Sequence, residues 1–191
     1  MDNQQRRSTP LLMVSNWFQF SMPELPKWVA AWLLDEGSTT TKFQQCCGCL
    51  QIECCFEGYL SQDDLSEEIS SLAMNDEPVW LREVLMMADG IPWLYGRSLI
   101  PKTLLEHPDL ALSTLGNTPL GARLFSLPKP PKREAIQITQ VLPTKALTLL
   151  ANQPTRRRWW ARRSRLSLPQ GALLLTELFL PASPLYQSSD E

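Results

Sequence analysis

An Asp-Gly pair between two apolar stretches constrains this fold more than any other feature of the sequence. The stretches at 80–87 and 92–100 flank Ala88-Asp89-Gly90-Ile91. Asp-Gly at such a junction is the strongest short-range signal for a hairpin with a two-residue type I′ turn. Counting pairs outward from this turn sets Arg82 opposite Arg97. The sequence therefore predicts an antiparallel hairpin in which two arginines face each other.

A second hairpin is predicted near the C-terminus. Apolar stretches at 160–168 and 172–180 are joined through Leu168-Pro169-Gln170-Gly171, which suits a type I turn. A four-residue loop sets Glu177 against Arg162 and aligns leucines across the two strands, whereas a three-residue loop faces those leucines with arginines. Hydrophobic matching favours the four-residue loop.

The rest of the chain adds a few helices and further strands. Apolar spacing predicts a helix over 25–36 that ends at Gly37, followed by a turn or short capped helix at 38–41. Strands are predicted at 49–59 and 134–141. Mostly antiparallel strands with a few helices indicate the α+β class.

Charge and composition exclude several kinds of protein. With 43% hydrophobic and 20% charged residues, the chain has the composition of a globular protein. Its 18 Lys+Arg against 20 Asp+Glu argue against a protein that coats nucleic acid or a membrane through a global positive field. The single histidine, His107, excludes sites built from several histidines. Because no apolar run suits a signal peptide or the roughly 20 residues of a spanning helix, we expect a cytoplasmic protein without membrane insertion.

Five cysteines fall within ten residues: Cys46, Cys47, Cys49, Cys54 and Cys55. An odd number in one short segment is a poor disulfide framework. The spacing of Cys46 and Cys49 resembles half a zinc site, but the second pair is adjacent rather than spaced. We therefore favour reduced thiols in a partly buried strand over a metal site.

The two arginines of the first hairpin are candidates for an anion site. Facing arginines on an apolar face would repel, and burying either charge without a partner is costly. An anion between them removes both problems, and guanidinium groups hold planar carboxylates bidentately. Alternatively, Arg82 and Arg97 reach solvent or pair with carboxylates of the protein. The pattern leaves both interpretations open.

Glu177 is a further candidate because it shares a strand face with Leu173, Leu175 and Phe179. A carboxylate in such a place is either a structural partner of Arg162 or a functional group whose ionisation burial tunes. The sequence favours neither.

Residues 156–165 read Arg-Arg-Arg-Trp-Trp-Ala-Arg-Arg-Ser-Arg. Arginine interleaved with aromatic side chains is typical of sites for single-stranded nucleic acid. The alternative is a basic loop followed by a strand whose alternate residues face solvent. The nearly neutral chain favours the strand, so no nucleic-acid partner is expected.

A series of short motifs runs in order through most of the chain. They are Trp80-Leu81-Arg82-Glu83, Ala88-Asp89-Gly90, Pro92-Trp93-Leu94, Gly96-Arg97, Leu115-Gly116, Thr118-Pro119-Leu120-Gly121, Leu124-Phe125, Arg162-Arg163-Ser164-Arg165-Leu166, and Leu173 through Tyr186. In this order, over about 28–186, the chain resembles the chorismate pyruvate-lyases of bacterial ubiquinone biosynthesis. The cysteine cluster is not a motif of that family.

The resemblance implies a single α+β domain over 25–186, an antiparallel sheet with a few helices that cover a buried ligand site. Residues 1–24 would be an irregular lead-in, 142–158 an exposed insertion, and 187–191 a tail. The family implies a monomer without metal or cofactor.

The implied reaction converts chorismate, a dianion, to 4-hydroxybenzoate and pyruvate, the first step of ubiquinone biosynthesis. By the resemblance, Arg82 binds the ring carboxylate with help from the backbone at Leu120. Glu177 contacts the ring hydroxyl, and Arg97 matches a second arginine of the site. Thr39 occupies a contact position that is often Met. Arg82 and Glu177 are thus the expected catalytic residues, with Glu177 either a general base for the C4 proton or a group that holds the hydroxyl.

A different class of function remains open. Ligand-sensing domains of some transcription regulators are similar in fold and bind small carboxylates without turnover. Such regulators normally carry a separate DNA-binding helix-turn-helix, whereas residues 1–79 show one clear helix. The alternative is therefore a non-catalytic effector-sensing module of the same fold.

Overall fold

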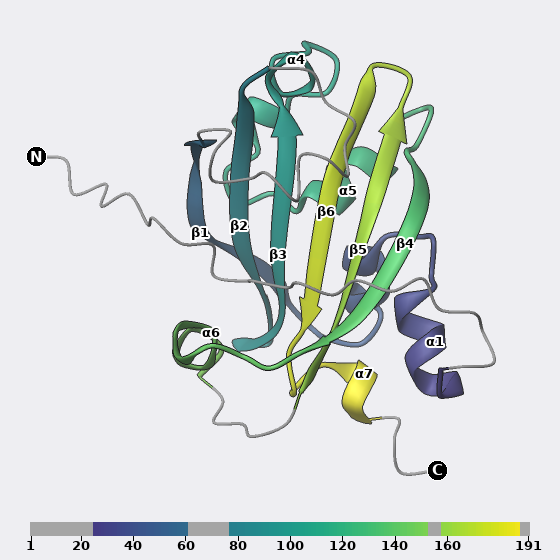
Figure 1. The fold of residues 1–191 in the computed structure, drawn as a ribbon, viewed down its shortest axis with the longest axis vertical. Coiled ribbons are helices and arrows are strands. Elements are labelled where there is room, and N and C mark those ends of the chain that lie inside the picture. The colour runs from purple at the N-terminus through teal and green to yellow at the C-terminus, as the bar shows by residue number, and fades with distance from the viewer. Residues whose placement is uncertain (1–24, 61–76, 153–157, 188–191) are drawn as a thin grey trace, which may run out of the picture.

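A computed structural model describes residues 25–60, 77–152 and 158–187 of the chain. Its centre is a six-stranded sheet in the order β1-β2-β3-β6-β5-β4 (Figure 1), in which all neighbouring strands are antiparallel. The strands are β1 (Leu50–Leu60), β2 (Val79–Ala88), β3 (Ile91–Pro101), β4 (Lys132–Val141), β5 (Trp159–Leu168) and β6 (Gly171–Phe179). The predicted α+β class and antiparallel sheet are confirmed.

Short helices join and cover these strands. They are α1 (Lys27–Leu33), α2 (Thr39–Gln44), α4 (Lys102–Leu105), the 3-10 turn η3 (Leu112–Thr114), α5 (Leu120–Phe125), α6 (Lys145–Leu150) and α7 (Pro184–Gln187). Helix α1 confirms a helix within 25–36, but it ends at Leu33 and not at the predicted Gly37. Helix α2 confirms the short capped helix predicted at 38–41, and the Ser38 side chain caps it by accepting a hydrogen bond from Thr41 N. In the described ranges, no helix is long and apolar enough to cross a membrane.

The two faces of the sheet carry different side chains. We call the face with Arg82, Gly96 and Glu177 the inner face; α2 and α5 lie over it, behind the sheet in the view of Figure 1. Aromatic and aliphatic side chains fill the rest of that space. The outer face carries Glu83 and Arg97, and α6 packs against its lower end.

The predicted lead-in at 1–24 lies outside the described residues, as do 153–157 of the predicted insertion and 188–191 of the predicted tail. Within the predicted insertion at 142–158, α6 buries Leu147 in the apolar cluster of the outer face, while Leu142 and Leu149 are exposed. The insertion is thus exposed only in part.

The turn of the first hairpin is the predicted one. Asp89 and Gly90 both have positive φ, 49° and 79°, as a type I′ turn requires. Ala88 lies opposite Ile91, also as predicted.

The register beyond this turn differs from the prediction. Trp93 is an extra residue in β3, a bulge that moves all later pairs by one. Arg82 therefore lies opposite Ser98, and Arg97 lies opposite Glu83. Because successive residues of a strand point to opposite faces, Arg82 and Arg97 lie on opposite faces. The prediction that these two arginines face each other is wrong.

The second hairpin has the predicted register. Glu177 lies opposite Arg162, and pairing continues to the turn. The basic run enters β5, but its arginines do not alternate with solvent: Arg162 is buried on the inner face and Arg163 on the outer face. A solvent-facing basic strand is therefore not what this segment forms.

All five cysteines are free thiols. Cys54 and Cys55 lie in β1, whereas the other three lie in the connection between α2 and β1. The predicted strand therefore holds only part of the cluster. No group of three or more His, Cys, Asp or Glu side chains within the described ranges is arranged to hold a metal ion.

Candidate functional site

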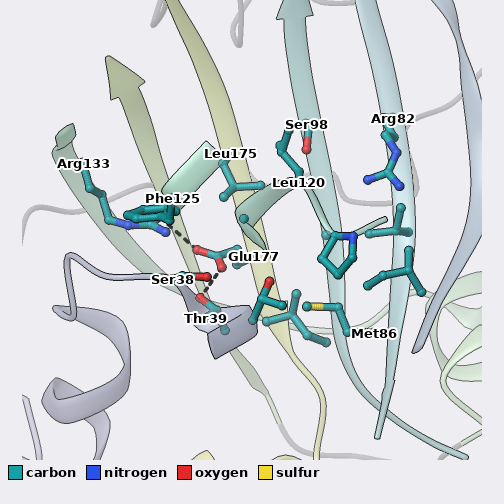
Figure 2. A pocket seen from close by; sticks show the side chains of 17 residues that line it. Ser38, Thr39, Arg82, Met86, Ser98, Leu120, Phe125, Arg133, Leu175 and Glu177 are labelled. Atoms are coloured by element: carbon teal, nitrogen blue, oxygen red, sulfur yellow. Dashed lines mark hydrogen bonds and ion pairs between the residues drawn. The ribbon is translucent and has the colours of Figure 1, made fainter. Parts of the chain in front are cut away.

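A cavity lies between the inner face of the sheet and the N-terminal ends of α2 and α5 (Figure 2). Its empty space is about 460 Å³, including space open to solvent. It is lined by Ser38, Thr39, Thr40, Ile52, Arg82, Val84, Met86, Leu94, Gly96, Ser98, Pro119, Leu120, Gly121, Phe125, Arg133, Leu175 and Glu177.

The two helices that roof the cavity meet at a glycine. A Cβ atom on Gly121 would lie 2.9 Å from Oγ1 of Thr40 and 3.1 Å from Oγ of Ser38. The first distance is shorter than a Cβ atom adopts and the second is tight, so a glycine at this position lets α5 lie close to α2. Leu120 is the first residue of α5, and its N–H therefore has no partner within the helix.

Arg82 is held rigidly at one side of the cavity. Its Nε donates to Oε1 of Glu57 at 2.7 Å, and its Nη2 donates to the carbonyl oxygens of Gly116 and Thr118 at 2.8 and 3.2 Å. No described residue accepts a hydrogen bond from Nη1. The guanidinium is therefore fixed in place with donor capacity left for an anion.

Glu177 lies at the other side (Figure 2). Its Oε2 accepts from Nε of Arg162 at 2.6 Å and from Nη1 of Arg133 at 3.1 Å, and its Oε1 accepts from the Thr39 hydroxyl at 2.5 Å. Burial by itself would raise the pKa of this carboxyl group, but Arg162 and Arg133 outweigh it and lower the pKa to about 2. The site therefore holds an ionised, buried carboxylate.

Arg162 fixes that carboxylate to the helices. Its Nη1 donates to the carbonyl oxygens of Trp32 at 3.1 Å and Asp35 at 2.6 Å, and its Nη2 donates to Oγ1 of Thr39 at 2.6 Å. These bonds connect the end of α1 and the start of α2 to the centre of the sheet. Glu177 is therefore a structural partner of Arg162 and also lines the cavity, and its functional role stays a prediction.

Arg133 was not identified from the sequence. Its Nη1 donates to Glu177 and to the Ser164 hydroxyl, and its Nη2 donates to the carbonyl oxygen of Gly37 at 3.3 Å. Burial lowers its pKa to about 10, although Glu177 opposes that shift. Arg133 lies at the start of β4, in a run of charged residues without alternation, so no local pattern marks it.

Four of the five residues predicted for the site line the cavity: Thr39, Arg82, Leu120 and Glu177. The fifth, Arg97, does not. It lies on the outer face, with Nη1 2.8 Å from Oε1 of Glu83, because of the bulge at Trp93. A direct contact between Arg97 and a ligand in this cavity would have to cross the sheet.

Solved structures show where this fold occurs. PhnF from Mycobacterium smegmatis superposes with a TM-score of 0.60 at 19% identity, covering 76% of this chain and 64% of that chain. The effector domain of the same protein, in a separate structure, also gives 0.60 at 16% identity and covers 74% and 88%. At these identities the likeness extends to the fold alone.

Sequence comparison is more specific. A chorismate pyruvate-lyase of Serratia proteamaculans is 44% identical over 171 residues, 89% of this chain and 88% of the relative. That of Hamiltonella defensa is 42% identical over 171 residues, 90% and 88% of the two chains. The model of the family described as chorismate lyase matches residues 11–190. This protein therefore belongs to the chorismate lyase family.

Proposed function

We propose that the protein is a chorismate pyruvate-lyase that forms 4-hydroxybenzoate and pyruvate in this cavity, the first step of ubiquinone biosynthesis. The observation that carries the proposal is the pairing of a rigid cation, Arg82, with a buried carboxylate, Glu177, on opposite sides of one cavity. Chorismate carries a ring carboxylate and a hydroxyl group at opposite ends of its ring. Each end of the ring would therefore meet the group that binds it.

The ring carboxylate is assigned to Arg82 and the N–H of Leu120. Nη1 of Arg82 has donor capacity left, and charge-assisted hydrogen bonds to a carboxylate are among the strongest in proteins. Leu120 contributes a backbone donor at the start of α5. Thr39 is assigned to the hydroxyl end because it contacts the carboxylate there.

Glu177 is assigned to holding the ring hydroxyl rather than to removing a proton from carbon. A carboxylate has about four lone-pair sites, and Arg162, Arg133 and Thr39 occupy three of them. One acceptor site is left on Oε1 for a hydroxyl donor. A carboxylate whose pKa is about 2 is a weak base, so of the two roles we propose positioning.

The chemical step then runs within the substrate. The C3–O bond breaks and its electron pair stays on the departing enolpyruvyl oxygen, which becomes the keto oxygen of pyruvate. The C4–H electron pair forms the new ring double bond, and the proton passes to the methylene carbon of the enolpyruvyl group. Atoms and electrons balance without oxidant or reductant, and the aromatic ring supplies the driving force. The protein contributes orientation and exclusion of water.

We also propose a cytoplasmic monomer that works without metal or cofactor and binds neither nucleic acid nor membrane. Five cysteines crowded into ten residues suit a reducing compartment. The formal charge of −2 gives no global attraction to polyanions.

The test is incubation of the purified protein with chorismate, following 4-hydroxybenzoate and pyruvate separately. Equimolar products are expected, and tight binding without turnover would instead identify an effector-sensing module. Arg82→Ala should cost about 2–5 kcal/mol of transition-state binding. Normal kcat/KM in a folded Arg82→Ala variant would overturn the assignment of the carboxylate site.

A further inference from the structure

We propose that Arg133 contacts the substrate and binds the enolpyruvyl group, and that it, rather than Arg97, is the second arginine of the site. This inference rests on the proposed function, since it concerns the second anionic group of the same dianion. It is carried by three observations: a surplus of positive charge around Glu177, a buried donor without a partner, and the place of Arg133 in the cavity wall.

The first observation is the charge balance of the cluster. Arg162 Nε and Arg133 Nη1 both contact the same Oε2 of Glu177, at 2.6 and 3.1 Å. Asp35 is a further carboxylate that interacts with Arg133, but its Oδ2 is paired with Lys42 Nζ at 2.8 Å. Two buried guanidinium groups therefore share one carboxylate. A buried surplus of one positive charge favours an anionic ligand.

The second observation is a donor that the protein leaves unused. Nε of Arg133 is buried and donates no hydrogen bond within the described residues. Arg162 differs, because all three of its nitrogens donate to protein acceptors. A buried donor without a partner is costly, and more so on a charged group. An acceptor on a ligand would remove that cost.

The third observation is position. Arg133 lines the cavity beside Glu177, whereas Arg82 lies on the opposite side (Figure 2). In chorismate the enolpyruvyl ether is on C3, next to the carbon that carries the hydroxyl. With the hydroxyl at Glu177, the C3 substituent lies at the same end of the cavity, where Arg133 lines the wall. Arg133 is thus placed to bind the enolpyruvyl carboxylate and to offset charge that develops on the departing oxygen.

The experiment compares two ligands that differ by the enolpyruvyl group. Chorismate carries it, and 4-hydroxybenzoate retains only the ring carboxylate and the hydroxyl. For Arg133→Gln we expect kcat/KM for chorismate to fall about 10- to 100-fold, as for the loss of a hydrogen bond to a charged group. The Kd of 4-hydroxybenzoate should change by no more than about threefold.

A residue that acts only by holding Glu177 would affect both ligands, because both carry the hydroxyl. Equal losses for chorismate and 4-hydroxybenzoate would therefore overturn the proposal, as would unchanged kcat/KM. Arg133→Lys keeps the charge without the planar fork, and we expect it to recover part of kcat/KM. It also serves if the Gln variant does not fold.

Arg165→Gln is the matched control. Arg165 lies on β5, on the outer face, opposite Glu134 of β4, and it does not line the cavity. Like Arg133→Gln, this substitution removes one positive charge from the pair of strands β4 and β5. We expect both ligand measurements to stay within about threefold of the unsubstituted protein. Equal losses in the two variants would attribute the Arg133 effect to general charge and overturn a direct contact. If the unsubstituted protein formed no product from chorismate, by contrast, that result would count against the proposed function itself.

Discussion

Both faces of the sheet bury an arginine and a glutamate directly opposite each other on neighbouring strands. On the outer face Arg97 lies 2.8 Å from Glu83, and on the inner face Arg162 lies 2.6 Å from Glu177. The two pairs are alike in burial and geometry, but among the described residues only Glu177, of the two glutamates, lines the cavity and contacts a second arginine. A buried ion pair is therefore not in itself the mark of a site. The additional donors and the adjoining space are what distinguish the inner pair.

The largest expected difference between the faces comes from removing each carboxylate charge. Glu177→Gln should lower kcat/KM on the order of 10²- to 10³-fold, as the loss of a key active-site hydrogen bond does. Glu83→Gln should leave kcat/KM within about threefold in the folded protein. Both should lose about 3–5 kcal/mol of unfolding free energy, because each breaks a buried ion pair by removing the charge of its carboxylate. Urea unfolding measures the loss of stability, and product assays measure kcat/KM. Equal losses of kcat/KM in the two folded variants would contradict the expected difference between the two faces.

The next effect is on the pH dependence of stability. The pKa of Glu177 is lowered from 4.5 to about 2 in the folded protein. Its ionised form therefore stabilises the fold fully above about pH 4.5, and this contribution is lost as the pH falls towards 2. It amounts to about 3 kcal/mol at neutral pH. Unfolding at pH 7 and at pH 3 should differ less in Glu177→Gln than in the unsubstituted protein. An unchanged difference would show that this carboxyl group is not the one that titrates.

The same low pKa predicts that Glu177 does not shape the activity profile near neutral pH. Between pH 5 and 8, kcat/KM should show no inflection from this group, because a carboxyl group with a pKa of about 2 stays ionised throughout. An acidic limb near pH 6 that disappears in Glu177→Gln would restore the general-base role.

The two ion pairs also differ in how well the sequence predicts the strand register that forms them. The Asp89-Gly90 turn follows from local backbone chemistry, and the Arg162–Glu177 register follows from matching leucines across β5 and β6. The bulge at Trp93 left no such signal. Apolar residues follow one another almost without alternation near the turn between β2 and β3, so shifting the register by one still pairs apolar side chains with each other. In β5, arginine and serine separate the apolar residues, so only one register aligns the leucines.

Arg133 shows a second limit. It reaches Glu177 across a separation of 44 residues, and a register shift between Glu134 and Gln137 interrupts the strand that carries it. No local pattern encodes such a contact. The resemblance placed Thr39, Arg82, Leu120 and Glu177 at the site, but for Arg97 it could not specify the face of the sheet.

Glu57→Gln sharpens the comparison between Arg82 and Arg97. Glu57 is about one-third exposed, whereas Glu83 is buried. Gln keeps an acceptor for Arg82 Nε but removes a negative charge that opposes an anionic ligand. We expect 4-hydroxybenzoate to bind about 2- to 5-fold more tightly, at a cost in stability below about 1 kcal/mol. Isothermal titration at two salt concentrations measures this gain, which should shrink as salt rises. Weaker binding would mean that Glu57 acts mainly by orienting Arg82.

The last prediction concerns a single hydroxyl group of the cavity. Thr39→Val removes the bond to Oε1 of Glu177 and an acceptor for Arg162, while keeping the branched shape of the side chain. Both partners of this hydroxyl are charged, and a hydrogen bond to a charged group contributes about 1.5–3 kcal/mol, so kcat/KM should fall by about tenfold or more. Thr176→Val is the matched control, since Thr176 precedes Glu177 on β6 and is buried on the outer face. If the two threonine variants lost activity equally, the effect would belong to the packing of β6 and not to the cavity. A loss confined to Thr39→Val would show that the hydroxyl helps to hold the carboxylate in place, although Arg162 and Arg133 alone keep it ionised.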